Sequence, residues 1–208
     1  MSSPLDQSVY QVRLDWGLAG LERLADADVV VIVDVLTFST AVTDAVAAGS
    51  TVALADVAEW SPDSVAPALA VTADAAGSTV LVGCLRNASA VAHAIQRIQE
   101  TRQRRTSVAI VPTGERDASN DVRFTVEDQL AAGAIAAALT DLGIDHTAPD
   151  AAVAAEGFRA LRRALGHLVS ASGSGRHLDD AATVAASARL DAVAAVPVFR
   201  ERSFAAFS

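Results

Sequence analysis

Acidic and hydroxyl side chains follow a strongly apolar stretch near the start of the chain. Residues 29–33 form a continuous β-branched run, which is typical of a strand covered on both faces. Asp34 ends this run, and Ser39 and Thr40 precede a helix predicted over residues 41–48. Small molecules bind outside the carboxyl ends of parallel strands, where a helix N-terminus attracts anions. Asp34 could hold a divalent cation there, or Asp34 and Ser39 could merely cap the helix.

A second group of charged side chains follows another predicted buried strand, over residues 107–111. The loop after this strand leads into a helix predicted over residues 126–142, which Thr125 would cap. Hard oxygen ligands beside cationic donors are what a metal-assisted phosphoryl site requires. Acids in the first turn of a helix also complement its dipole, so the two helical acids have an ordinary explanation as well. The charged residues are Glu115, Arg116, Asp117, Asp121, Arg123, Glu127 and Asp128.

A Ser/Gly-rich segment over residues 170–176 is the third candidate. We interpret it as a loop that ends in Arg176. Its backbone N–H groups could cradle a phosphate or a sulfonate, or the segment could be a flexible connector. Composition does not separate these two interpretations.

These candidates must be positioned by strands and helices that alternate along the chain. Strands are predicted over residues 9–14 at an edge, 29–33 at the centre of a parallel sheet, 51–55, 79–82, 107–111 and 193–198. Helices are predicted over 20–24, 41–48, 67–76, a long helix from 87, 126–142, 151–170 and a last one ending near 190. This order predicts an α/β protein.

Length and charge limit the classes of protein and partner. A chain of 208 residues suits one domain, over residues 1–208. The net charge of −9 argues against nucleic acid and anionic membranes as partners. The one basic run, residues 102–105, is expected at a helix end, where it offsets the dipole.

Other sequence features bear on location and chemistry. The single cysteine, Cys84, excludes a disulfide framework, so the cytoplasm is the expected location. The chain has no apolar run of about 18 residues and does not start like a signal peptide, so a soluble, unexported protein is expected. Dinucleotide-binding, P-loop and nucleophile-elbow motifs are absent from the sequence.

Four segments of the chain resemble the 2-phosphosulfolactate phosphatases of the coenzyme M pathway. The likeness spans most of the chain, and the four segments together are specific. They are DWGLAGLERL with VVVIVDVLTFSTAV near the start, GCLRNASAVA, PTGERDASNDVRFTVEDQLAAGAI, and SASGSGRHL with LDAVAAVPV toward the end.

The resemblance implies a three-layer α/β/α fold with a largely parallel central sheet. It also implies a Mg²⁺-dependent phosphatase that hydrolyses 2-phospho-3-sulfolactate, or a similar small phosphorylated acid, and a possible homodimer. Carried over by position, Asp34 and Glu115 would hold Mg²⁺. Asp34, Glu127 and Asp128 are the predicted catalytic acids, and Asp128 would orient the attacking water. The predicted substrate-binding residues are Ser39, Thr40, Asn87, Arg116, Arg123 and Arg176.

The chain departs from the family pattern in three places. Thr37 stands where many relatives have arginine, residues 61–64 are a changed form of the Ser-Pro-Asn-Gly-Ser motif, and a segment before that motif is missing. These departures motivate an alternative, a non-catalytic ligand-binding or scaffolding relative with a decayed active site. We also predict that Arg123 replaces the missing positive charge, which requires it to point toward Asp34 and Glu115.

Overall fold

The structure is a computed structural model that describes residues 3–116 and 121–208. Asp117, a charged candidate of the sequence, lies outside the described residues. Within the described residues, a seven-stranded sheet has the order β1-β5-β2-β4-β8-β9-β3. The strands of this sheet are β1 (Val12–Leu14), β2 (Val29–Val33), β3 (Val52–Ala53), β4 (Thr79–Gly83), β5 (Val108–Pro112), β8 (Pro197–Arg200) and β9 (Ser203–Ala206). Strands β6 (Glu115–Arg116) and β7 (Val122–Arg123) form a separate hairpin.

The sheet is parallel through β1, β5, β2 and β4, and antiparallel from β8 to β3. Strand β2 pairs with β4 on one side and with β5 on the other, so it lies at the centre of the parallel part. Strand β1 lies at an edge. The predicted places of the first two strands and the largely parallel sheet are therefore confirmed.

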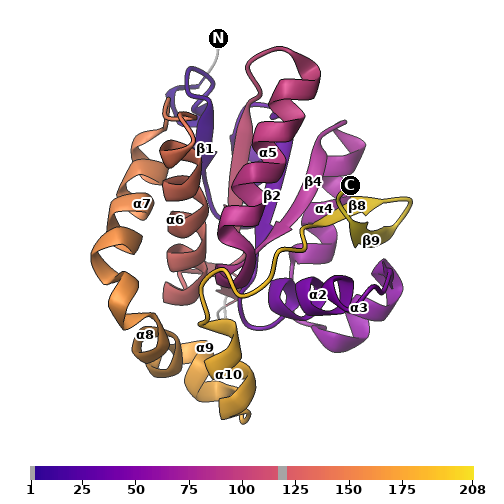
Figure 1. The fold of residues 1–208 in the computed structure, drawn as a ribbon, viewed down its shortest axis with the longest axis vertical. Coiled ribbons are helices and arrows are strands. Elements are labelled where there is room, and N and C mark those ends of the chain that lie inside the picture. Colours follow the sequence, from indigo (N-terminus) through magenta and orange to yellow (C-terminus); the bar gives the residue numbers. More distant parts are fainter. Residues whose placement is uncertain (1–2, 117–120) are drawn as a thin grey trace.

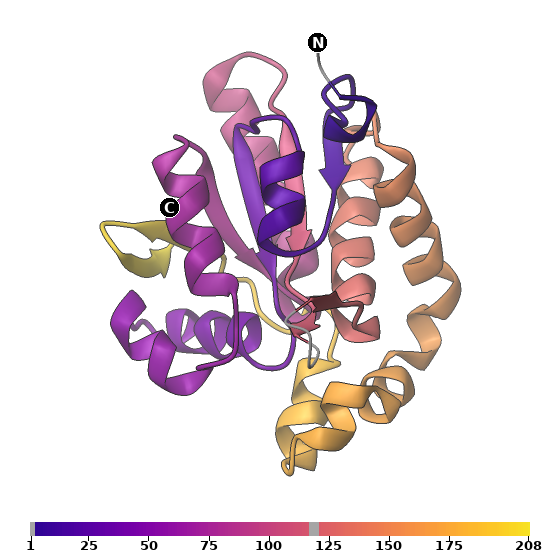
Figure 2. The same ribbon diagram turned by 180° about the vertical axis from the view of Figure 1, so that it is seen from behind.

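Helices cover both faces of the sheet. They are α1 (Gly17–Arg23), α2 (Phe38–Ala47), α3 (Leu54–Trp60), α4 (Ala66–Ala75), α5 (Ala88–Arg102), α6 (Val126–Asp141), α7 (Pro149–Leu161), α8 (Leu165–Ala171), α9 (Gly173–His177) and α10 (Ala181–Ser187). Figure 1 shows α5 in front of the sheet and α6 and α7 to the left of β1, with α8, α9 and α10 below them. The reverse view in Figure 2 brings α1 and α4 to the front. The fold is thus the expected three-layer α/β/α arrangement.

The β-branched run of β2 explains why both faces are covered. Because side chains alternate along a strand, Val29, Val31 and Val33 join the apolar core under α5 and α6. Val30 and Ile32 join the second core, under α2 and α4. All five residues are buried. The two cores lie on opposite faces of one sheet; the prediction of one domain over residues 1–208 stays a prediction.

The predicted boundaries of two elements, the helix that follows β2 and the strand after that helix, were wrong. Helix α2 begins at Phe38, three residues before the predicted start. The reason is that the Ser39 N–H donates to the Asp34 carbonyl at 2.7 Å, so the first turn closes directly onto the end of β2. The strand predicted over 51–55 is reduced to β3, because the chain enters α3 at Leu54.

The Ser/Gly-rich segment is helical, so the predicted loop over 170–176 was wrong. Helix α8 ends at Ala171 and α9 begins at Gly173. Ser172 joins the two helices, and its hydroxyl accepts the Gly175 N–H at 2.9 Å as an N-cap. The long helix predicted over 151–170 is also interrupted, by a 3₁₀ turn at Arg162–Ala164.

The last strand predicted, over 193–198, was placed too early, because only residues 197–198 lie in a strand, which is the first strand of a hairpin. Strand β8 begins at Pro197 and returns through β9. The turn uses Glu201 and Arg202, both at positive φ, 49° and 57°. Glycine and asparagine favour this conformation and would indicate such a turn in a sequence, whereas Glu and Arg do not indicate one. The sequence therefore carries no signal for the return strand.

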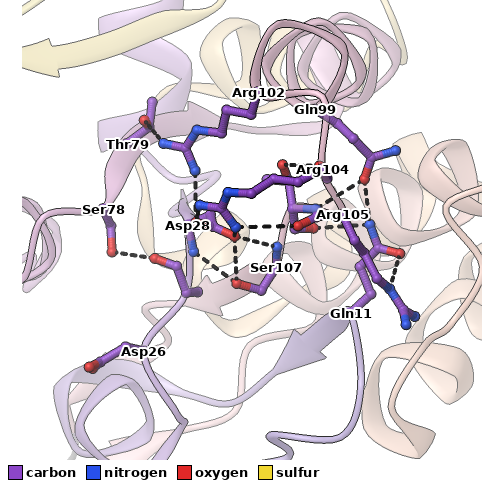
Figure 3. Close-up of polar contacts among 12 residues, drawn as sticks. Gln11, Asp26, Asp28, Ser78, Thr79, Gln99, Arg102, Arg104, Arg105 and Ser107 are labelled. Carbon is purple, nitrogen blue, oxygen red and sulfur yellow. Dashed lines mark hydrogen bonds and ion pairs between the residues drawn. The ribbon is translucent and has the colours of Figure 1, made fainter.

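The amino ends of the parallel strands are held together by Asp28 (Figure 3). Arg102 and Arg104 approach its Oδ1 at 2.8 Å and 2.5 Å. The N–H and hydroxyl of Ser107 donate to its Oδ2 at 2.9 Å and 3.1 Å. Arg102 is in the last turn of α5, as expected, and the basic run also pairs with this carboxylate. Asp28 thus links the starts of β2 and β5 to the end of α5.

Within residues 3–116 and 121–208, we find no helix with both the length and the apolar character needed to cross a membrane.

Candidate active site

Three acids gather at the carboxyl ends of β2 and β5. Asp34 directly follows β2, and Glu127 and Asp128 lie in the first turn of α6. Their exposed fractions are 7%, 2% and 3%. An acid that merely complements a helix dipole stays in water, so burial of the two helical acids argues for a site.

Asp34 is fixed by contacts from three segments. Its carboxylate accepts the hydroxyl proton of Ser64 at 2.5 Å, and the Phe38 N–H and the Thr113 hydroxyl also lower its pKa. Its own N–H donates to Ser39 Oγ at 2.9 Å. Burial raises the pKa of Asp34 to about 6, against the lowering effect of these bonds and with a contribution from the charge of Glu127. Thr37 is the N-cap residue of α2 and makes no side-chain capping bond, so the interpretation that Asp34 and Ser39 merely cap this helix was wrong, and Asp34 belongs to the acid cluster.

Asp128 connects α6 to the ends of both strands. Its Oδ1 accepts the Val35 N–H at 2.7 Å, just beyond β2. Its Oδ2 accepts the Gly114 N–H at 3.1 Å and the Thr125 hydroxyl at 2.8 Å. Burial raises the pKa of Asp128 well above its ordinary value, and the negative charge of Asp34 raises it further. Thr125 is the N-cap residue as predicted, although its hydroxyl bonds the Asp128 side chain.

One carboxylate oxygen of Glu127 has no hydrogen-bond partner among the described residues. Its Oε1 accepts the hydroxyl of Ser174 from helix α9. Its Oε2 is buried and has no hydrogen-bond partner among the described residues. The charge of Glu127 also acts on both aspartates, so the three carboxylates form one electrostatic cluster. A buried, unpartnered carboxylate oxygen is costly and marks a position for a ligand.

Glu115 and Arg123 form an ion pair in the hairpin beside the acids. Arg123 Nη1 lies 2.9 Å from Glu115 Oε2, and both side chains are partly exposed. Gly114 directly precedes β6 at φ +64°, where a Cβ would lie 2.5 Å from the Arg123 carbonyl oxygen. A Cβ on Gly173 would lie 3.1 Å from Arg123 Nη1, so this guanidinium also reaches α9. Arg123 points toward Glu115. That its charge replaces the arginine missing at position 37 stays a prediction.

Three predicted substrate-binding side chains are used to shape the backbone around the site. The Thr40 hydroxyl donates to the Val35 carbonyl at 2.8 Å, and Ser39 bonds Asp34 as described. The Asn87 amide donates to the carbonyls of Val82 and Ala195, at 3.2 Å and 3.1 Å. Asn87 is fully buried and also accepts the Cys84 N–H. The structure gives all three a supporting role, and their contact with substrate stays a prediction.

Two predicted arginines are exposed. Arg116 lines a cavity of about 580 Å³ together with Trp16, Val65 and Phe124. None of the three buried acids is among the residues that line this cavity. Arg176 lies in the last turn of α9.

Sequence reasoning missed several hydroxyl groups that hold the acids. Ser64 and Ser174 bond Asp34 and Glu127, and Thr113 lies 3.4 Å from Asp128. Both serines stand in segments that the sequence singles out, 61–64 and 170–176. The composition of those segments was a signal, but it did not identify which hydroxyl reaches an acid.

The acid cluster suits Mg²⁺ as a partial ligand set. Its donors are hard carboxylate oxygens, and Glu127 Oε2 is unpartnered. In the part of the chain that the structure describes, no group of three or more acids, histidines or cysteines is arranged to hold a metal ion. Mg²⁺ is commonly held by one or two carboxylates together with water and substrate phosphate, so the residues present fit this ion.

Comparison with known proteins gives the family. No curated protein sequence matches the chain significantly. The family model described as 2-phosphosulpholactate phosphatase matches residues 67–202, well over half of the chain. Glu127, Asp128 and Ser174 lie inside the matched range, and Asp34 lies before it. The chain therefore belongs to the 2-phosphosulpholactate phosphatase family, a family of phosphoric monoester hydrolases.

Proposed function

We propose that this protein is a Mg²⁺-dependent phosphatase that hydrolyses 2-phosphosulpholactate, or a similar small phosphorylated acid, to the hydroxy acid and phosphate. The observation that carries the proposal is the unpartnered Oε2 of Glu127, buried beside Asp34 and Asp128. A buried oxygen of this kind is what a cation or a reacting group would satisfy. Family membership supports the reaction class.

The acids would divide the work of binding and proton transfer. Asp34 and Glu127 offer oxygen atoms to Mg²⁺, which when bound would neutralise charge on the phosphoryl oxygens. Glu115, predicted with Asp34 as a ligand, would have to leave Arg123 to join them. Asp128 Oδ1 accepts the Val35 N–H and keeps a second lone pair, which can accept a proton of the attacking water.

The arginines would bind the anionic substrate. Arg116 and Arg123 belong to the hairpin that continues from the end of β5, and Arg176 belongs to α9. Guanidinium groups match the geometry of phosphate and carboxylate oxygens with two parallel hydrogen bonds. These three side chains would offset the negative charge that the acids place at the site.

One observation favours the alternative of a binding protein with a decayed site. The Thr37 hydroxyl lies 3.3 Å from Ser61 Oγ, so the position that carries arginine in many relatives contacts another neutral side chain. Asp63 of the changed motif is exposed and adds a negative charge nearby. Such a protein would bind an anion weakly and release no phosphate.

Phosphate release from a panel of small phosphomonoesters, including 2-phosphosulpholactate, tests the proposal. Wild type, Asp34→Ala and the control Asp74→Ala, an exposed acid of α4, are assayed with Mg²⁺ and with excess chelator. We expect release that chelator abolishes, that Asp34→Ala reduces by at least about 100-fold and that Asp74→Ala leaves unchanged. Folded wild-type protein that releases no phosphate would favour the binding protein instead.

A further inference from the structure

We propose that Ser174 is a positioning residue, which holds Glu127 so that its free oxygen faces the cation position, and that α9 is thereby part of the active site. The inference rests on the proposed function and deepens it. It assigns a role to the Ser/Gly-rich segment that neither a phosphate cradle nor a connector describes. The evidence comes from the contacts of Glu127, from the other serines of the segment and from the packing of α9.

The two oxygens of Glu127 have opposite environments. Ser174 donates its hydroxyl proton to Oε1, while Oε2 has no partner among the described residues. Glu127 is 2% exposed and Ser174 is 9% exposed, so water does not replace either contact freely. A glutamate side chain has three rotatable bonds, and a hydrogen bond at one oxygen determines where the other points. Ser174 is therefore what fixes the open oxygen.

Ser174 differs from its neighbouring serines in this respect. The Ser170 hydroxyl donates to the Gly166 carbonyl at 2.8 Å, within α8. The Ser172 hydroxyl donates to the Val169 carbonyl at 2.9 Å and caps α9. Both serines serve the backbone of their own helices, whereas Ser174 reaches an acid of α6.

The short helix is packed so that it presents Ser174 at one place. A Cβ on Gly175 would lie 2.0 Å from the Val169 carbonyl oxygen, so α9 folds back tightly against the end of α8. On its other side, Arg123 lies against Gly173. The Ser174 carbonyl accepts the Leu178 N–H at 2.9 Å. These contacts hold α9 between α8 and the hairpin that carries Glu115.

Loss of the hydroxyl would leave both oxygens of a buried carboxylate without a partner. The side chain would then rotate toward another partner, which removes an oxygen donor from the cation position. Outer contacts that orient a metal ligand are typically worth about 10- to 100-fold in metal affinity. A purely structural serine would not change this quantity in a folded protein.

Mg²⁺ titration by calorimetry, without substrate, tests the proposal on wild type, Ser174→Ala, Ser174→Cys and Ser174→Thr. We expect Ser174→Ala to weaken Mg²⁺ binding about 10- to 100-fold, and Ser174→Thr, which keeps a hydroxyl, to restore most of it. Ser174→Cys replaces the hydroxyl by a weak donor of similar size and should resemble Ser174→Ala. If Ser174→Ala does not fold, the Mg²⁺ affinity of Ser174→Cys is the quantity that tests the proposal.

Ser170→Ala is the matched control, because the exposed Ser170 hydroxyl bonds the Gly166 and His167 carbonyls within α8 and does not touch Glu127. It should leave Mg²⁺ affinity unchanged. Unchanged affinity in folded Ser174→Ala and Ser174→Cys would overturn the role of Ser174. Wild type that binds Mg²⁺ but hydrolyses no phosphomonoester would overturn the proposed function alone, and wild type that does neither would overturn both.

Discussion

At the scale of single residues, the energetic problem of this protein is the shared burial of Asp34, Glu127 and Asp128. Each negative charge there disfavours the others, and burial adds to the cost of ionisation. Hydrogen bonds from Ser64, Val35 and other donors offset part of the cost. The remaining cost is carried by the folded protein in the absence of a cation, and it can be measured.

Asp34→Asn should stabilise the protein at pH 8 in the presence of chelator. The pKa of Asp34 is about 6 when folded and about 3.8 when unfolded, so the folded state binds more protons between these values. The free energy of unfolding therefore falls as the pH rises from about 4 through 6, by about 3 kcal/mol in all. Asparagine carries no charge and escapes this loss. Urea unfolding of both proteins at pH 4 and pH 8 measures the difference.

The control for this prediction is Asp74→Asn, which alters an exposed acid and should show no such dependence on pH. The stabilisation by Asp34→Asn should also vanish toward pH 4, where the wild-type side chain is protonated. An Asp34→Asn variant less stable than wild type at pH 8 would contradict the prediction.

The acids were predictable from the sequence, whereas their partners were not. Asp34 ends an apolar strand and Asp128 opens a helix, and both are local patterns. The bonds from Ser64 to Asp34 and from Ser174 to Glu127 join residues 30 and 47 positions apart. Such contacts depend on how elements pack, which no local pattern encodes. The same holds for Asn87, whose amide bonds Val82 of β4 and Ala195, which lies two residues before β8.

At the scale of elements, the contact between α6 and α7 is close because one residue lacks a side chain. A Cβ on Gly133 would lie 2.1 Å from the Ala154 carbonyl oxygen and 2.9 Å from Phe158 Cβ. The obstacle is backbone, which cannot rotate away. Helix α6 carries Glu127 and Asp128, so its position determines that of the acids.

Gly133→Ala should destabilise the protein by about 1–3 kcal/mol or more, because α7 must move to admit the methyl group. Gly157→Ala is the matched control in α7. A Cβ there meets nothing within 4 Å, and alanine in place of glycine should stabilise an exposed helix position by about 0.5–1 kcal/mol. Thermal unfolding of both variants gives the comparison. Equal stabilisation by the two substitutions would refute the close contact.

The elements predicted well are those with strong periodicity. The helix predicted over 126–142 matches α6 within one residue, and the strand predicted over 29–33 matches β2. The elements missed are short or irregular. Helix α9 is five residues of Ser, Gly, Arg and His, a composition typical of loops. The return strand β9 depends on a turn with unfavoured residues, Glu201 and Arg202.

At the scale of the whole molecule, the two edges of the parallel sheet have opposite electrostatics. The carboxyl edge holds uncompensated acids, while at the amino edge Asp28 is surrounded by Arg102, Arg104 and Ser107 (Figure 3). Burial alone would raise the pKa of Asp28, but the bonds from Arg104 and Ser107 outweigh it and lower the pKa. The amino edge therefore stabilises the fold, whereas the carboxyl edge holds the candidate site.

Asp28→Asn should destabilise the protein by about 1–2 kcal/mol at pH 7, since it weakens contacts that join two strands and a helix. Because the folded pKa of Asp28 lies below the unfolded value of 3.8, its contribution is present above that value and disappears as the pH falls further. The gap to wild type should thus narrow below about pH 4. Urea unfolding at pH 7 and pH 3.5 checks this, and a gap that widens in acid would contradict it.

The strand order also dictates when the sheet can be completed during synthesis. Strand β3 lies at the edge and pairs with β9, in the register Val52 with Phe204 and Ala53 with Ser203. A ribosome makes β3 early and β9 late, so the partner strand of β3 emerges after the other strands of the sheet. The parallel strands β1, β2, β4 and β5 have their partners first, so β3 waits without a neighbouring strand until residues 203–206 have emerged. The assembly of this edge is therefore timed by the end of translation of that segment, whatever the speed of the earlier steps.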